Sequence, residues 1–106
     1  MIVTTGNDLP GYEIAQFPGV VRGITVRTPN IAQGIVGGLK RIVGGNNDTF
    51  TQVCDQARQD AYDLLVAHAE ELGADAIIGM RYDATEFMQA FTEVLAYGTA
   101  VKLSRG

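Results

Sequence analysis

The residues with the strongest metal-binding or nucleophilic chemistry are one cysteine and one histidine, Cys54 and His68. Both belong to one predicted helix, where fourteen positions correspond to about 21 Å along the axis. Ligands of one metal ion lie a few ångströms apart, and a cysteine–histidine dyad needs contact at about 3 Å. We therefore expect no metal site or dyad from this pair within one subunit. Cys54 is expected to be a small buried thiol, and His68 a hydrogen-bonded or interface histidine.

Carboxylates and a hydroxyl are the next candidates. Asp60 and Asp63 lie one helical turn apart and would hold a hard cation weakly, but a solvated carboxylate face is the commoner explanation. Asp75 stands at the start of a predicted strand, where it is expected to accept backbone N–H bonds across the sheet or a subunit boundary. The single serine, Ser104, lies in the C-terminal tail, where a preorganised nucleophile is not expected. We predict no catalytic, cofactor or metal residues, and a protein that is not an enzyme.

A glycine-rich stretch, residues 34–40, superficially resembles a phosphate loop. That motif needs four residues between its glycines and a Lys-Ser or Lys-Thr pair opening a helix. Here Lys40 and Arg41 stand near a predicted helix end, where cations complement the helix dipole. Gly73, Gly79 and Gly98 are likewise interpreted as a helix cap and sites of close backbone approach.

The composition fits one domain, residues 1–106. A chain of 106 residues that is 46% hydrophobic can build one core. The net charge of −4, with scattered cations, argues against a nucleic-acid partner. One cysteine forms no intramolecular disulfide, the N-terminus does not resemble a signal peptide, and no apolar run nears the roughly 20 residues of a membrane span. We therefore expect a cytoplasmic protein without a membrane partner.

The first half of the chain predicts extended structure followed by a short helix. Residues 10–27 favour one long strand, bent at Pro18-Gly19, and residues 2–5 favour a short edge strand. Pro29 and Asn30 then suit the start of a helix that Gly44-Gly45 ends. Glycines 34, 37 and 38 weaken this helix, so close packing against a neighbour is expected to support it.

A long amphipathic helix follows, capped near residues 47–49 and ended by Gly73. Two alanines at its centre suggest that it lies close against a sheet. Its predicted apolar stripe comprises Phe50, Val53, Cys54, Ala57, Ala61, Leu64, Leu65, His68 and Leu72.

Two strands complete the chain, residues 74–82 and 92–103, and are expected to pair as an antiparallel hairpin. Both faces of the last strand are largely apolar, and one helical layer covers only one of them. The predicted order is strand, helix, helix, strand, strand in an α+β fold with an antiparallel sheet. Along the first strand of the hairpin, alternation places these side chains on one face: Ala76, Ile78, Met80 and Tyr82.

Four segments in this order carry a family resemblance: residues 19–23 (GVVRG), 39–45 (LKRIVGG), 72–79 (LGADAIIG) and 98–102 (GTAVK). With them the chain resembles the YbjQ-like family of small bacterial proteins, which carries a heavy-metal-binding label without an established activity. The resemblance implies a β-α-β-β core related to dodecin subunits, assembled as a ring-shaped pentamer.

Two classes of function follow. The first is an oligomer-forming structural or interaction protein. The second is a small-ligand or metal-binding module whose site lies between subunits, where symmetry multiplies Cys54, His68 or Asp75.

Overall fold

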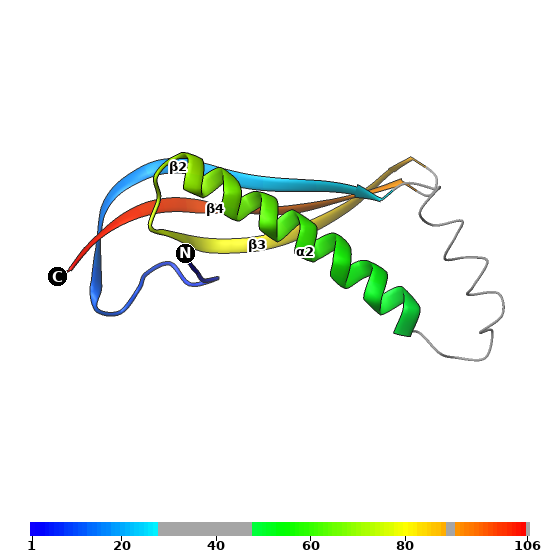
Figure 1. Cartoon of the computed structure of the whole chain (residues 1–106), viewed down its shortest axis with the longest axis horizontal. Helices are drawn as coiled ribbons and strands as arrows, with labels where there is room; N and C mark the ends of the chain where they lie inside the picture. The colour runs from blue at the N-terminus through cyan, green and yellow to red at the C-terminus, as the bar shows by residue number, and fades with distance from the viewer. Residues whose placement is uncertain (28–47, 89–90, 106) are drawn as a thin grey trace.

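The fold is a four-stranded sheet with one long helix packed on one face (Figure 1). The computed structural model describes residues 1–27, 48–88 and 91–105. Its elements are β1 (Ile2–Val3), β2 (Tyr12–Arg27), α2 (Asp48–Glu71), β3 (Ala76–Met88) and β4 (Phe91–Arg105).

The sheet order is β1-β3-β4-β2. The α+β class, the long strand, the long helix and the antiparallel β3–β4 hairpin are confirmed. The sheet is mixed rather than purely antiparallel, because β1 pairs in parallel with β3. The predicted glycine-rich helix before Gly44-Gly45, with Lys40 and Arg41, lies outside the described residues, so the predicted two-helix order is tested only for the other elements.

The β2 strand bends where the sequence places Pro18-Gly19. Gly19 has a φ of 139°, a conformation that favours glycine, and the β2–β4 register shifts between Ile14 and Gly19. The register is regular from Gly19 to Arg27. The bend therefore separates a short N-terminal part of β2, before Gly19, from a regular C-terminal part that runs to Arg27.

A second irregularity, at Gly79, corrects the predicted faces of β3. Gly79 has a φ of 61°, and the β3–β4 register shifts between Ile78 and Arg81. Ile78 consequently packs in a small cluster with Ala76 and Val101, whereas Met80 belongs to the core under α2. Strict alternation over the strand was wrong because the bulge inserts a residue. A Cβ at Gly79 would meet only the Asn7 Oδ1 at 3.6 Å, so its left-handed backbone, not close approach, requires glycine.

The end of α2 follows the expected glycine cap. The N–H of Gly73 donates to the Glu70 carbonyl at 3.0 Å, and the N–H of Ala74 donates to the Ala69 carbonyl at 3.0 Å. With a φ of 71° at Gly73, this is a Schellman motif. The chain turns there directly into β3.

The buried stripe of α2 is narrower and smaller than predicted. Ala57, Ala61, Leu65 and Ala69 are buried, at intervals of four residues. Leu64 is 51% exposed and Leu72 is 38% exposed, and Cys54 is also exposed, which corrects their predicted burial. The helix packs closely on the sheet at Ala61 because the residue beneath it on β2, Gly23, has no side chain. A Cβ added at Gly23 would meet the Ala61 carbonyl oxygen and would lie 2.5 Å from the Leu65 backbone nitrogen.

This contact makes Ala61 a sensitive position. Ala61 is fully buried against the sheet, so Ala61→Leu should overpack the contact and lower the free energy of unfolding by about 1–3 kcal/mol. Urea denaturation measures the effect. Ala67→Leu is the matched control, because Ala67 is exposed on the same helix and the change there should stay within about 0.5 kcal/mol. Equal midpoints for wild type and Ala61→Leu would contradict the assigned face.

The sheet face away from α2 is covered only in part. Near the chain ends, Leu9, Ile14 and Leu103 pack on the cluster of Ala76, Ile78 and Val101. Farther along, large apolar side chains of this face remain exposed on β2 and β4. Their exposed fractions are Val20 72%, Ile24 43%, Val26 42% and Tyr97 38%.

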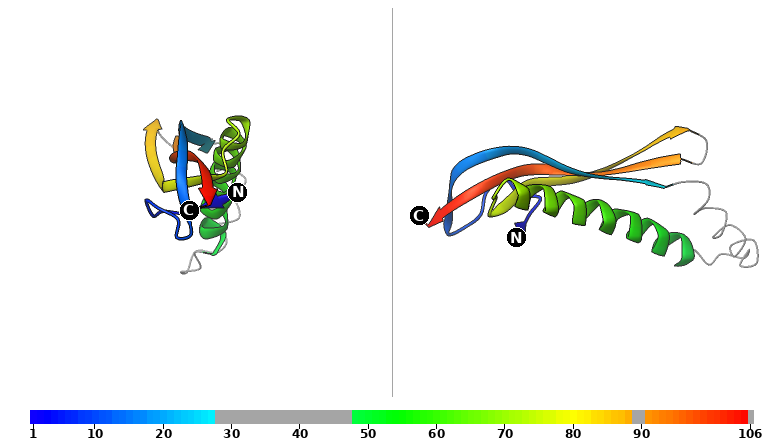
Figure 2. Two further views of the ribbon diagram at one scale, coloured as in Figure 1. Left: turned by 90° about the vertical axis from the view of Figure 1, so that its left-hand side faces the viewer. Right: turned by 45° about the horizontal axis from the view of Figure 1, so that its top comes forward.

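The molecule is elongated. Its principal extents are 56 × 24 × 17 Å and its radius of gyration is 17.2 Å, whereas a compact domain of this length has about 13 Å. Figure 2 shows that the C-terminal end of α2 lies on the sheet and that the helix diverges from the sheet toward its N-terminal end.

Candidate functional site

Cys54 and His68 do not form a common site. Both lie on α2, as predicted, fourteen positions apart, and helical rise separates them by about 21 Å. Cys54 is exposed near the start of the helix, while His68 is half-buried in its last turn. Among the described residues, no three His, Cys, Asp or Glu side chains gather as a metal site would require.

His68 has a structural partner on β2. The backbone N–H of Arg22 donates to His68 Nδ1 at 3.2 Å, so Nδ1 is the accepting nitrogen of the ring. This confirms the expectation of a hydrogen-bonded histidine. The contact ties the last turn of α2 to a strand 46 residues away in sequence.

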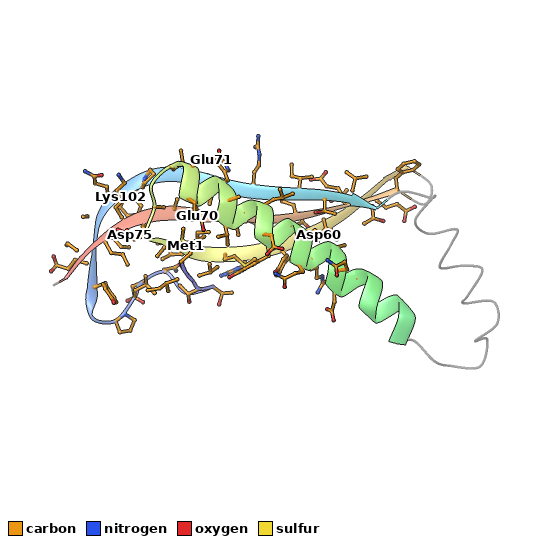
Figure 3. The ribbon with its side chains drawn as sticks, viewed as in Figure 1. Met1, Asp60, Glu70, Glu71, Asp75 and Lys102 are labelled. Atoms are coloured by element: carbon orange, nitrogen blue, oxygen red, sulfur yellow. The ribbon has the colours of Figure 1, made fainter. Side chains whose placement is uncertain are left out.

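Asp60 and Asp63 form an ordinary solvated helix surface. Each is exposed and accepts a hydrogen bond from a glutamine four residues earlier, Gln56 to Asp60 at 2.8 Å and Gln59 to Asp63 at 2.9 Å. These pairs at one-turn spacing support the helix by a few tenths of a kcal/mol. Figure 3 shows Asp60 along α2, away from Asp75, so the two carboxylates do not converge.

Asp75 joins the start of β3 to β4, as the sequence suggested. Its Oδ2 accepts the N–H of Leu103 at 2.8 Å, and its own N–H donates to the Val101 carbonyl at 2.9 Å. Asp75 thus extends the hydrogen bonding between β3 and β4 by one residue before β3 begins at Ala76. Beside it, a shallow groove of about 370 Å³ is lined by Ile2, Tyr12, Asp75, Leu103 and Ser104.

Replacing this carboxylate should weaken the joint. Asp75→Ala removes the acceptor for the Leu103 N–H and should cost about 1 kcal/mol of unfolding free energy, since the site is exposed and water replaces part of the bond. Asp75→Asn keeps an oxygen acceptor and should cost less. Chemical denaturation of both variants checks the order, and equal stability of Asp75→Ala and wild type would remove the assigned role.

A second groove, of about 620 Å³, lies where α2 diverges from the sheet, lined by Asp55, Gln56, Arg58, Gln59 and Tyr82. The Arg58 guanidinium lies 5.9 Å from the centre of the Tyr82 ring, a cation–π contact. Burial raises the pKa of the Tyr82 phenol, Tyr62 and Asp63 act in the same direction, and Arg58 opposes them. The phenol therefore remains a hydrogen-bond donor at neutral pH.

This groove was not anticipated from the sequence. The apolar stripe predicted for this helix leaves out Arg58 and Gln59, and the predicted alternation placed Tyr82 on the same strand face as Ala76 and Ile78. Tyr82 reaches α2 because the Gly79 bulge shifts the register before it. No local pattern indicates that shift beyond the glycine itself.

The geometry defines a class: a small α+β protein with one helix on a mixed sheet, in whose described part no three His, Cys, Asp or Glu side chains are grouped to hold a metal ion. A family model described as "Putative heavy-metal-binding" (YbjQ_1) matches residues 1–104. The chain belongs to this family. The resemblance found in the four sequence segments is thereby confirmed.

Bacterial relatives cover nearly the whole chain. A UPF0145 protein of Legionella pneumophila (strain Corby) is 54% identical over 101 residues, 95% of this chain and 96% of that protein. A UPF0145 protein of Solibacter usitatus is 54% identical over 95% of this chain and 90% of its own length. A third UPF0145 protein, from Burkholderia thailandensis, is 47% identical over 98% of this chain and 94% of its own length.

A solved structure supports the fold. The crystal structure of a protein with unknown function, of the DUF74 family from Pediococcus pentosaceus, covers 98% of both chains with a TM-score of 0.64 at 24% identity. At that identity the likeness concerns the fold alone. Separately, no helix among the described residues is long and apolar enough to cross a membrane.

Proposed function

We propose that the chain is a non-catalytic structural or interaction protein whose working form is a homo-oligomer, a ring-shaped pentamer. The observation that carries the proposal is the apolar face of the sheet that α2 does not cover. Val20 at 72% and Ile24 at 43% exposure lie on it, and Phe17 on β2 is 63% exposed. Exposed apolar patches on soluble proteins mark contact surfaces.

The shape supports the same proposal. An elongated chain with a radius of gyration of 17.2 Å buries less of its surface than a compact domain of equal length. Association with further copies of the chain would bury the surface that the elongated chain leaves exposed. The pentamer and the dodecin-like ring come from the family resemblance.

The mass in solution tests the proposal. Light scattering on a sizing column and native mass spectrometry at micromolar concentration should give about five times the chain mass of 11.3 kDa. The mass of a single chain under these conditions would overturn the proposal.

A second candidate is a small-ligand or metal-binding module with its site between subunits. The family description and the groove beside Asp75 favour it. Native mass spectrometry combined with elemental analysis of the purified oligomer separates the candidates, since a stoichiometric co-purified ligand or metal supports the module.

For zinc we expect a negative result at the level of one chain. A tetrahedral zinc site needs four ligands, and helical rise holds Cys54 and His68 about 21 Å apart. Calorimetric titration of the metal-stripped protein with Zn²⁺ should therefore show no submicromolar binding at one metal per subunit. Such binding, abolished by Cys54→Ala or His68→Ala, would contradict this expectation and favour the metal-binding module.

A further inference from the structure

In the part of the chain that the structure describes, no strand lies beside the outer edge of β2. β2 is the last strand of the sheet, paired with β4 on one side only. Because the Arg22 N–H donates to His68 rather than to its partner Tyr97, Arg22 and Tyr97 form a non-hydrogen-bonded pair. Arg22 therefore directs its backbone groups outward, and by alternation so do Ile24 and Val26.

His68 sets the limit of this open edge. It occupies the outward N–H of Arg22, and Leu64, one turn earlier on α2, lies beside Gly23. From residue 24 to residue 27, no strand or hydrogen-bonding side chain covers the outward backbone groups in the described part of the chain. Unpaired edges of this kind template strand addition.

Among the described residues, the opposite edge of the sheet is also uncovered along part of β3. The N-terminal segment covers the start of β3, through β1 and through the Met80 N–H, which donates to the Thr4 carbonyl at 3.0 Å. Arg81 closes this region with a bond from its guanidinium to the Thr5 carbonyl at 2.8 Å. Beyond it, residues 82–88 have β4 on one side and no described strand on the other.

The two open edges carry opposite charge. Residues 24–27 contain Arg27 and no carboxylate, whereas residues 82–88 contain Asp83 and Glu86 and no cation. Pairing residues 24–27 with their own copy would bring two arginines together, and pairing residues 82–88 with their own copy would bring four carboxylates together. Like charges directly opposite destabilise a strand pair, while unlike charges stabilise it.

We propose that residues 24–27 of β2 in one copy pair in parallel with residues 82–88 of β3 in the next copy. β2 and β3 run in the same direction, since each is antiparallel to β4, so a rotated copy continues the sheet with strand direction preserved. This contact is head to tail, and a head-to-tail contact closes into a ring when its rotation closes. The inference rests on the proposed oligomer and names its contact surface. Figure 2 shows this end of the sheet standing away from α2.

Proline at Ile24 tests the edge. The backbone N–H of Ile24 faces away from β4, so Ile24→Pro leaves the β2–β4 hydrogen bonds intact. The change removes one outward-facing donor and places the proline ring on the outer edge of β2. Ile24→Val, which keeps the N–H and the apolar side chain, is the control. The proline variant should lose the oligomer at micromolar concentration by light scattering, and the valine variant should keep it. A folded proline variant with the wild-type mass would overturn the pairing, although not the oligomer.

Cysteine cross-linking tests the partner without relying on how the proline variant folds. In a Cys54→Ala background, Ile24→Cys is combined with Thr85→Cys or, for the neighbouring register, with Asp83→Cys. Within one chain β4 separates these positions by two strand spacings, about 9.5 Å, beyond the roughly 7 Å Cα limit of a disulfide. Oxidation should give a ladder of linked chains on a non-reducing gel.

Each other outcome is decisive. An oligomer in which neither pair cross-links contradicts the pairing alone, and dimers from Ile24→Cys by itself would show β2 paired with its own copy. A wild-type chain that is monomeric removes the proposed function together with this inference.

Discussion

Gly23→Ala should destabilise the protein by about 3 kcal/mol or more. An added Cβ would overlap the Ala61 carbonyl oxygen and stand 2.5 Å from the Leu65 nitrogen and 2.8 Å from the Leu64 Cβ. Two of these three are helix backbone atoms, which no rotamer change moves aside, so α2 must lift from the sheet. Overpacking of flexible neighbours costs about 1–3 kcal/mol, and rigid backbone neighbours place this case at the upper end or beyond.

Gly6→Ala is the control for the glycine change itself. A Cβ there meets the Thr4 Oγ1 at 3.5 Å, an ordinary contact, so stability should change by less than about 0.5 kcal/mol. Urea denaturation of both variants at one fixed protein concentration makes the comparison, because oligomer stability depends on concentration. Equal midpoints for Gly23→Ala and Gly6→Ala would show that α2 does not contact β2 at this point.

The second large effect is expected at Leu65. Leu65 is fully buried in the core under α2, so Leu65→Ala should remove about 2–5 kcal/mol through lost burial and the cavity left behind. Its neighbour provides a matched control in the same helix and with the same chemistry. Leu64 is 51% exposed, and Leu64→Ala should cost less than about 1 kcal/mol.

The adjacent leucines distinguish the two possible faces of α2. The apolar pattern assigned both to the buried stripe, whereas the structure buries one of them. Thermal unfolding at a fixed concentration should rank Leu65→Ala far below Leu64→Ala. The reverse order would mean that the helix is rotated about its axis from the position described.

The sequence by itself determined the elements with local causes. Apolar spacing of three and four residues and a glycine exit defined α2 and its end at Gly73, and β-favouring residues with Pro18-Gly19 defined β2 and its bend. Helical rise also separated Cys54 from His68, because a regular helix fixes distances along its axis. The hydrogen bond of Asp75 was anticipated since its strand-start position leaves a carboxylate beside a neighbouring strand.

Only the tertiary structure decided which residues meet. The buried alanines of α2 face the sheet, and Leu64 and Leu72 do not, because Gly23 lets the helix backbone approach β2. This contact joins segments about 40 positions apart in the sequence. The bulge at Gly79 turned Met80 and Tyr82 toward α2, since one inserted residue reverses every later face of a strand. The partner of His68 likewise became known only once helix and strand were placed together, because a hydrogen bond depends on distances in space that the local pattern of either segment does not contain.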